Sequence, residues 1–483
     1  MTATRSQGFA RSALWKAMLI VSVLASPSLA EDFLERFEQT PSRFPRVESE
    51  ASSDTTRTAD ENVIPAAFEA APATGDLAKR VSEIEAQLKK SADAERKKKA
   101  DDAKRPSYKL AMQLQADAYL SNQEQANKNT VGDIPNGSAF RRARFGFSGD
   151  YGVFDYRIEM DFALPGRPSF LDVTVGMNEL PCVGHVRIGH FFEPFSMERL
   201  TRNRFLTFME RALPDQPFAP ARNLGAMIYN WSDDQMTTWA LGSFYVNSDV
   251  WGDAVGDSHG QSVTGRMTRL LWYDEPSDGR YWCHVGGGYS FRGSDHKRVR
   301  FRAQPEARLG SAVPNIPFVV DTGDIAANFN QLINAELALV YGPWSASAEY
   351  FWVPVDRINA PNPTFHGWYA QTSYFLTGEH RPYNRKDGTF DRVYPFEDFF
   401  RVSTPTGICT GAGAWEAAVR ISQLDLNSRG VAGGMVTDLT VGLNWYMNPW
   451  TRLTTDWVHS FLDRAPGGKS NADLWGIRMG FEY

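Results

Sequence analysis

The chain has 483 residues, enough for two or three ordinary domains or one large barrel. Its 51 lysines and arginines are outnumbered by 57 acidic residues, and the net charge of −6 gives no indication of nucleic-acid binding. Any attraction for anions must therefore come from a local cluster of basic residues. Beyond the N-terminus, no apolar run approaches the ~20 residues that a membrane helix needs, which excludes helical membrane proteins.

The composition also argues against an enzyme and against a resident cofactor. The eight histidines are dispersed, and no HExxH or GxSxG motif is present, so neither a metal centre nor a serine hydrolase is indicated. Three cysteines without a CxxC spacing exclude a disulfide framework. Whether any of them pair stays open: Cys182, Cys283 and Cys409.

Residues 1–30 have the pattern of a secretory signal peptide. A basic start precedes a short apolar run at 17–25, and Ser28-Leu29-Ala30 forms a small-residue cleavage site. The mature chain is therefore predicted to begin near Glu31. A retained membrane helix is the weaker alternative, because the apolar run is too short to span a bilayer.

Two further segments precede the folded region. Residues 31–75 are rich in Ser, Thr, Pro, Ala and Glu without periodicity, which predicts a disordered tether. Within 76–104, Leu77, Val81, Ile84 and Leu88 recur at spacings of four, three and four residues. This pattern predicts a short coiled-coil helix that would form in an oligomer, although a solvated lone helix remains the alternative.

From Lys109 onward the sequence alternates between apolar and polar residues, as in the hairpin from Phe140 to Phe162. In its second arm, every even position from 154 to 162 is large and apolar, and every odd position is charged. Because side chains alternate across a strand, one face is apolar and the other charged. A soluble sheet would bury the apolar face, whereas a transmembrane barrel would turn it to lipid and the charged face to a lumen.

The number and spacing of such segments favour the barrel. About sixteen segments of roughly ten residues can be counted, and the connections between them alternate between short and long. One connection, 377–412, is long where a short turn belongs. We therefore predict an all-β fold over residues 105–483, a transmembrane antiparallel β-barrel of about sixteen strands with short periplasmic turns.

The C-terminal segment supports the same interpretation. Trp475, Ile477, Met479, Phe481 and Tyr483 share one face of a strand that runs to the last residue. In a barrel this strand closes onto the first one and leaves no free edge. A terminal aromatic residue such as Tyr483 is also what outer-membrane assembly machinery commonly recognises. A soluble propeller or sandwich would explain the alternation but not this terminus.

Several blocks of sequence resemble the phosphate-selective porin O and P family. They are Phe140–Gly149, Val186–Arg199, Phe205–Arg211 with Phe218–Asn223, Tyr374–Tyr383, and Gly413–Glu416 leading to Arg420. The resemblance covers the barrel from about Lys109 to Tyr483. It implies a homotrimer of sixteen-stranded barrels in the bacterial outer membrane, in contact with its lipid, each carrying phosphate or related oxyanions through its own pore.

Anion selection requires fixed cations along the pore, and the densest basic stretch is 292–308. It holds six basic residues against Asp295 and Glu306. The spacing of two places Arg298, Arg300 and Arg302 on one face of an extended segment, with Arg308 nearby. Family members line the pore with such an arginine ladder, and the resemblance carries that role onto these three residues. A solvated charge run is the alternative interpretation.

Two other regions are candidates for the anion pathway. The 191–222 connection follows the fifth strand, where porins fold a loop into the barrel, and Arg202 and Arg204 are its predicted pore-facing residues. Arg141 and Arg142 belong to a segment from which family members place arginines at the constriction. By strand parity these two should point in opposite directions, so one of them could instead bind a lipid headgroup.

The long 377–412 connection is the third region, with Arg381, Arg385 and Lys386. It is expected to fold into the lumen from the periplasmic side, as in the resembled porins. A flexible loop in the periplasm is the alternative. Together these features predict a passive outer-membrane channel selective for anions, and the resemblance implies phosphate or polyphosphate as the anion. A general or carbohydrate-selective porin is the second hypothesis, and which anion is preferred stays open.

Overall fold

The computed structural model of the protein describes residues 105–483 except 165, 254–258, 311–315 and 405–406, together with residues 79, 82–91 and 93. The predicted signal peptide and tether, 1–30 and 31–75, lie outside the described residues. Residues 82–91 are helical, within the segment for which a coiled coil is predicted. No helix among the described residues is both long and apolar enough to cross a membrane.

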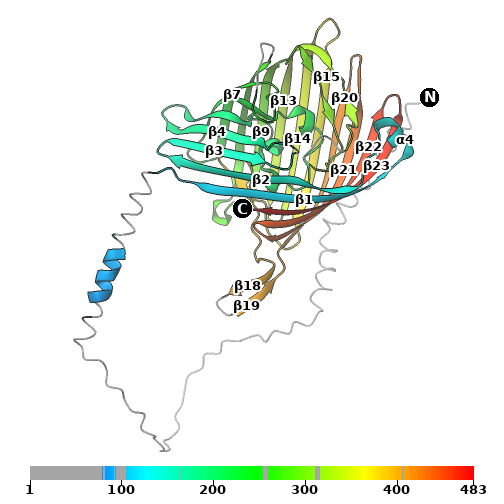
Figure 1. Ribbon diagram of the computed structural model, residues 1–483. Helices are drawn as coiled ribbons and strands as arrows, with labels where there is room; N and C mark the ends of the chain where they lie inside the picture. The colour runs from blue at the N-terminus through cyan, green and yellow to red at the C-terminus, as the bar shows by residue number, and fades with distance from the viewer. Residues whose placement is uncertain are drawn as a thin grey trace, which may run out of the picture. The chain divides into compact units, whose positions relative to one another are not determined.

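The described part of the barrel is one large antiparallel sheet that closes on itself (Figure 1). The sheet holds seventeen strands, one of which, β10 (Arg298–Val299), is a two-residue addition to β13. The other sixteen form the wall: β1 (Lys109–Gln123), β2 (Gly137–Tyr151), β3 (Phe154–Asp161), β4 (Ser169–Leu180), β5 (Gly184–Phe192), β6 (Arg222–Trp231), β7 (Thr237–Tyr245), β8 (Gln261–Tyr273), β9 (Tyr281–Gly293), β13 (Ile325–Tyr341), β14 (Trp344–Arg357), β15 (Thr364–Phe375), β20 (Ala414–Ser428), β21 (Val431–Asn448), β22 (Thr451–Arg464) and β23 (Gly468–Glu482).

The last strand pairs with the first, which closes the barrel as predicted from the C-terminal sequence. Gln113 lies opposite Glu482 and Gln123 lies opposite Ala472. The main chain of Tyr483 continues the pairing by exchanging hydrogen bonds with Met112. Because every wall strand has two neighbours, no backbone edge of the wall is left unpaired.

Alternating residues give the wall an apolar outer face and a polar inner face. In β21, Asp438, Thr440 and Asn444 are fully buried inside, whereas Val441 and Leu443 are exposed on the outside. The predicted hairpin behaves in the same way: Phe145 is exposed outside, and Arg144 forms an ion pair of 2.9 Å with Asp161 inside. The predicted segments between 223 and 273 are strands β6, β7 and β8.

The connections at the end where β1 begins and β23 ends are short, such as 232–236, 342–343 and 449–450. The longest connections between other strands, such as 193–221 and 294–324, lie at the opposite end, together with the short 429–430 and 465–467. The long connection 376–413 lies at the short-turn end, as predicted. Small elements within the connections are α4 (Gln125–Val131), α5 (Met197–Leu200), η1 (Asn203–Phe205), α6 (Asp215–Phe218), η2 (Glu275–Ser277), and the strand pairs β11 (Arg302–Ala303) with β12 (Val320–Asp321), β16 (Tyr383–Asn384) with β17 (Thr389–Phe390), and β18 (Phe400–Thr404) with β19 (Gly407–Gly411).

Two of the long connections fold into the barrel and pack against its inner wall. We call 193–221, between β5 and β6, the constriction loop, and 294–324, between β9 and β13, the basic loop. The main-chain amide of Met209 donates to Asp456 on β22 over 2.7 Å, and Glu306 forms an ion pair of 2.6 Å with Arg420 on β20. Phe218 and Phe301 stack edge to face at 5.5 Å in an interior apolar cluster. The two loops therefore narrow the lumen.

Two of the three cysteines are described as free thiols. Cys182 is exposed, and Cys283 is buried in the wall. The side chain of Cys409 is not among those described, so its pairing stays open.

Candidate functional site: two basic cavities along the lumen

Two sizeable cavities lie beside the inward loops in the described part of the barrel, and basic residues line both of them. The outer cavity, of about 390 Å³, lies between the constriction loop and the basic loop. Seven arginines line it against only two acidic residues, Glu210 and Asp215: Arg141, Arg142, Arg199, Arg211, Arg300, Arg302 and Arg308.

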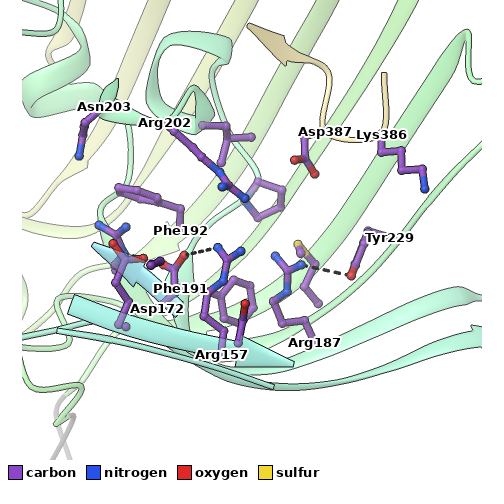
Figure 2. Close-up of a pocket in the computed structure, with 18 of the residues that line it drawn as sticks. Arg157, Asp172, Arg187, Phe191, Phe192, Arg202, Asn203, Tyr229, Lys386 and Asp387 are labelled. Atoms are coloured by element: carbon purple, nitrogen blue, oxygen red, sulfur yellow. Dashed lines mark hydrogen bonds and ion pairs between the residues drawn. The ribbon is translucent and has the colours of Figure 1, made fainter. Parts of the chain in front are cut away.

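The turn-side cavity, of about 260 Å³, lies between the constriction loop, the inner face of the wall and the tip of the 376–413 connection (Figure 2). Its acidic residues are Glu159, Asp172 and Asp387. Nine basic residues line it: Arg144, Arg157, Arg187, Arg202, Arg204, Arg211, Arg222, Arg266 and Lys386. Arg211 lines both cavities, which places the constriction loop between them.

A β-bulge turns both Arg141 and Arg142 into the lumen. Gln115 of β1 lies opposite Arg142, but the next residue, Ala116, lies opposite Phe140, so Arg141 is an extra residue in β2. Such an insertion breaks the strict alternation of faces. Both arginines are buried and line the outer cavity. The expectation from parity that they point in opposite directions is therefore wrong.

The two neighbouring arginines differ in their partners. Arg141 donates two hydrogen bonds to the carboxylate of Glu210, which also accepts one of 2.8 Å from Arg478. Burial of Glu210 opposes its ionisation, but the guanidinium groups of Arg141 and Arg478 hold the pKa of its carboxyl well below the usual range. Arg142 donates to the amide oxygen of Gln115 over 2.6 Å and has no ion pair with the described residues. Its charge is therefore available to an anion in the cavity.

The structure separates the four arginines predicted in the basic loop. Arg298 is exposed, lies 3.6 Å from Asp324, and lines neither cavity. Arg300 lines the outer cavity in an ion pair of 2.5 Å with Asp321. Arg302 lies 4.1 Å from the ring centre of Phe318, and both it and Arg308 line the outer cavity without an ion pair to the described residues. The expected single face is interrupted because β10 pairs with β13 and β11 pairs with β12.

Arg202 and Arg204 of the constriction loop lie on the turn-side cavity. The loop forms its first helical turn, α5, at Met197–Leu200, where the hydroxyl of Ser196 caps the amide of Arg199. Arg202 follows this helix and is exposed to the cavity, with no hydrogen bond or ion pair to the described residues (Figure 2). Arg204 lies 5.2 Å from the ring centre of Phe205.

Other arginines of the constriction loop stabilise its conformation. Arg211 donates to the main-chain oxygens of Glu198 and Thr201 at 2.9 and 2.7 Å. Arg199 donates to that of Ala219 at 2.9 Å and forms an ion pair of 3.1 Å with Asp215. These bonds satisfy carbonyls that the irregular backbone leaves without partners. The charges of Arg199 and Arg211 are thus partly used within the loop.

The 376–413 connection enters the lumen from the short-turn end. Arg381 is fully buried, forms an ion pair of 2.8 Å with Glu416, and donates to the carbonyl oxygen of Phe205 in the constriction loop. Arg385 forms an ion pair of 2.7 Å with Glu275, and Lys386 lies 4.9 Å from the ring centre of Trp231. Of the three predicted residues, only Lys386 lines a cavity. Arg381 instead attaches the connection to β20, and Arg385 attaches it to the turn between β8 and β9.

Several lumen-facing arginines of the wall were not among the predicted site residues, Arg157 and Arg187 among them. Arg157 on β3 lies 3.3 Å from Asp172, and Arg187 on β5 donates to the hydroxyl of Tyr229 over 3.2 Å (Figure 2). Both point toward Arg202 from the opposite wall (Figure 2). In the sequence, these arginines could be recognised by their position on the charged face of alternating strands. Alternation does not show, however, which wall residues face a narrow section of the lumen.

Comparison with known proteins agrees with the fold. Porin O of Pseudomonas aeruginosa is 25% identical over 421 residues, covering 78% of this chain and 88% of that protein. An uncharacterized protein of Caulobacter vibrioides is 29% identical over 321 residues, covering 64% of this chain, and the match spans 60% of that relative's length.

Among solved structures, a loop-deletion mutant of OmpT from Vibrio cholerae matches with a TM-score of 0.49 and 12% identity, over 78% of this chain and 99% of that one. An anion-selective porin from Comamonas acidovorans matches with a TM-score of 0.47 and 13% identity, over 78% of this chain and 100% of that one. The sequence model of the phosphate-selective porin O and P family matches residues 108–483. With its closed sixteen-stranded barrel, the chain therefore belongs to this family and is an outer-membrane porin.

Proposed function

We propose that the protein is a passive channel selective for anions, with phosphate, polyphosphate or related oxyanions as its substrates. The observation that carries this proposal is the excess of cations at the two cavities. Fifteen different basic side chains line them, against five acidic ones, although the whole chain has a net charge of −6. Fixed cations beside a narrow path favour the entry of anions and oppose that of cations.

The unpaired cations among these residues support the proposal further. Seven have no ion pair with the described part of the chain: Arg142, Arg302 and Arg308 at the outer cavity, and Arg187, Arg202, Arg204 and Lys386 at the turn-side cavity. Six of the seven are arginines, whose planar guanidinium group can make two charge-assisted hydrogen bonds to one oxyanion. An anion would thus meet successive binding groups on both sides of the constriction loop.

Planar-bilayer recordings across a potassium chloride gradient test the selectivity. We expect a reversal potential that favours chloride over potassium, and chloride current that falls when phosphate is added. Replacing Arg300 and Arg302 with glutamine should weaken the phosphate block and leave folding unchanged. A reversal potential that favours potassium, without phosphate block, would contradict the proposal.

A carbohydrate-selective porin is the competing function. Sugars would need aromatic faces open to the lumen, but the ring of Phe192 in the turn-side cavity is covered by the guanidinium group of Arg222 at 3.9 Å. Swelling of porin-containing liposomes in neutral sugars separates the two functions. Rapid swelling that is independent of the arginine substitutions would favour the carbohydrate porin.

The remaining expectations belong to the same proposal. The chain would be exported with cleavage near Glu31 and recognised by the assembly machinery through its C-terminal strand. It would then function as a homotrimer in outer-membrane lipid, with the coiled coil of 76–104 joining the protomers. N-terminal sequencing of the protein from outer membranes tests the cleavage site, and chemical cross-linking in those membranes tests the trimer.

A further inference from the structure

The 376–413 connection crosses the rim of the barrel and reaches its outer surface. Val393 is buried in a cluster with Phe375 and Tyr446, and the hydroxyl of Tyr446 bonds to Glu416 inside the lumen. Six residues later, the ring of Phe399 contacts that of Trp445 edge to face at 4.6 Å. Because Trp445 and Tyr446 are consecutive in β21, they face opposite sides of the wall. Phe399 therefore lies on the outside.

The returning chain is attached at the same place. The indole nitrogen of Trp445 donates to the carbonyl oxygen of Ala412 over 2.9 Å. The main-chain amide of Phe399 donates to the carbonyl oxygen of Met447 over 2.6 Å. Between these points, β18 and β19 form a separate two-stranded hairpin beyond the end of the barrel at which the C-terminus lies (Figure 1). The hairpin is thus joined to the outer rim of the wall and not to the pore mouth.

The outer rim at this point carries a band of aromatic residues. Trp415 and Trp445 stack with their ring centres 5.1 Å apart, and Trp344 lies opposite Tyr374 on the next pair of strands. The side chains of Trp344 and Tyr374 are exposed. Aromatic residues in this position on a transmembrane barrel mark the boundary between hydrocarbon and water.

The hairpin and the segment leading to it extend this band with four exposed aromatic side chains. Tyr394, Phe396 and Phe400 are 59–64% exposed, and Phe399, whose ring centre lies 6.0 Å from that of Phe400, is 42% exposed. An apolar surface of this kind is unfavourable in water and marks a site of contact with a membrane or a protein. The exposed side chain of Arg401 beside them can reach lipid phosphates.

We propose that Tyr394, Phe396, Phe399 and Phe400 form a membrane-anchoring surface that rests in the interfacial layer of the periplasmic leaflet. Lipid is the occupant because the surface is continuous with the lipid-facing aromatic band through Phe399 and Trp445. The surface places the periplasmic hairpin at the level of the headgroups, where its aromatic rings and Arg401 are both stabilised. This proposal is independent of the ion selectivity of the pore.

Spin labelling of the full chain in lipid vesicles tests the proposal. In a background with Cys182, Cys283 and Cys409 changed to serine, a nitroxide is attached to Phe400→Cys, and its collisions with oxygen and with a water-soluble nickel complex are compared. Matched positions are Val441→Cys on the lipid-facing wall and Asp233→Cys in an exposed short turn. Unchanged single-channel conductance shows that each labelled protein is folded.

We expect the label at 400 to collide with oxygen severalfold more than with nickel, relative to the label at 233, and thus to resemble the label at 441. Equal nickel accessibility at 400 and 233 would overturn the proposal, because the surface would then lie in water. Protection from both reagents would also overturn it, because the surface would then be covered by protein.

Discussion

Arg141 and Glu210 form two parallel hydrogen bonds across the lumen, 2.8 and 2.9 Å long, between β2 and the constriction loop. This geometry is the bidentate pairing that arginine makes with carboxylates. It compensates the charge of Arg141, whereas the next residue, Arg142, faces the same cavity without a carboxylate partner among the described residues. Two consecutive arginines therefore have different expected functions, one in holding the loop and one in binding the anion.

The first prediction concerns Arg142. Replacing Arg142 with glutamine should weaken phosphate block of the chloride current roughly tenfold, because a hydrogen bond to a charged group contributes about 1.5–3 kcal/mol. Titration of the block in planar bilayers measures this effect. Arg298→Gln is the matched control, since Arg298 is exposed and lines neither cavity. Equal losses in the two variants would mean that overall charge, and not the outer cavity, determines the block.

The second prediction concerns Arg202 at the turn-side cavity. Its side chain is exposed there without a partner among the described residues, so Arg202→Gln should lower the chloride-to-potassium permeability ratio without loss of barrel stability. Arg202→Lys retains the charge and should retain the ratio. Reversal potentials measured for both variants test this. A ratio that falls equally in Arg202→Lys would show that shape and not charge is responsible.

The third prediction concerns the anchor of the basic loop. Glu306 is buried and bonds to Arg420, Ser422 and Thr440. Glu306→Ala should destabilise the protein by about 3–5 kcal/mol, because it leaves a buried guanidinium group without its partner. Unfolding by urea in micelles measures the loss, and a larger single-channel conductance would report release of the loop from the lumen.

A paired replacement distinguishes the ion pair from simple loss of packing. Glu306→Leu combined with Arg420→Met removes both charges of the pair and should cost less than Glu306→Ala alone, although it also removes the 3.6 Å ion pair of Arg420 with Glu198. If the double variant is as unstable as the single one, the anchor depends on shape and not on the ion pair.

The fourth prediction tests the orientation of the wall. Val441 lies near the middle of β21 and is exposed on the outer face. Val441→Arg should cost about 2–4 kcal/mol in folding experiments with lipid vesicles, because an arginine at the bilayer midplane faces hydrocarbon. Trp344→Arg, at the first residue of β14 in the aromatic band, should cost only about 0–1 kcal/mol. Equal costs at both positions would contradict the expected depth dependence.

The hairpin from Phe140 to Phe162 shows how much of the fold could be predicted from sequence. Its alternation indicated the polar and apolar faces, and the structure confirms that Phe145 is outside while Arg144 and Asp161 pair inside. The same alternation and the aromatic C-terminal strand predicted the barrel and its closure. These features are local or repeat along the chain with period two. They can therefore be recognised in the sequence without knowing which strands pair.

The candidate site was only partly predictable. The predicted basic residues include Arg142, Arg202, Arg302, Arg308 and Lys386, which face the cavities without an ion pair to the described residues. Arg381 and Arg385 were predicted with them, but they bind Glu416 and Glu275 and attach the inward connection to β20 and to the turn between β8 and β9. Nothing in the spacing of the basic residues distinguishes these two groups.

By itself, the sequence determined the barrel, the faces of its strands and the abundance of arginine in its long connections. Only the tertiary structure decided which arginines are compensated. Arg478 meets Asp117 at 2.6 Å although 361 residues separate them in the chain. The bulge at Arg141 depends on the register between β1 and β2. The physical reason is that alternation reflects one strand's environment, whereas the compensation of a charge depends on contacts across the lumen that exist only after the loops have folded inward.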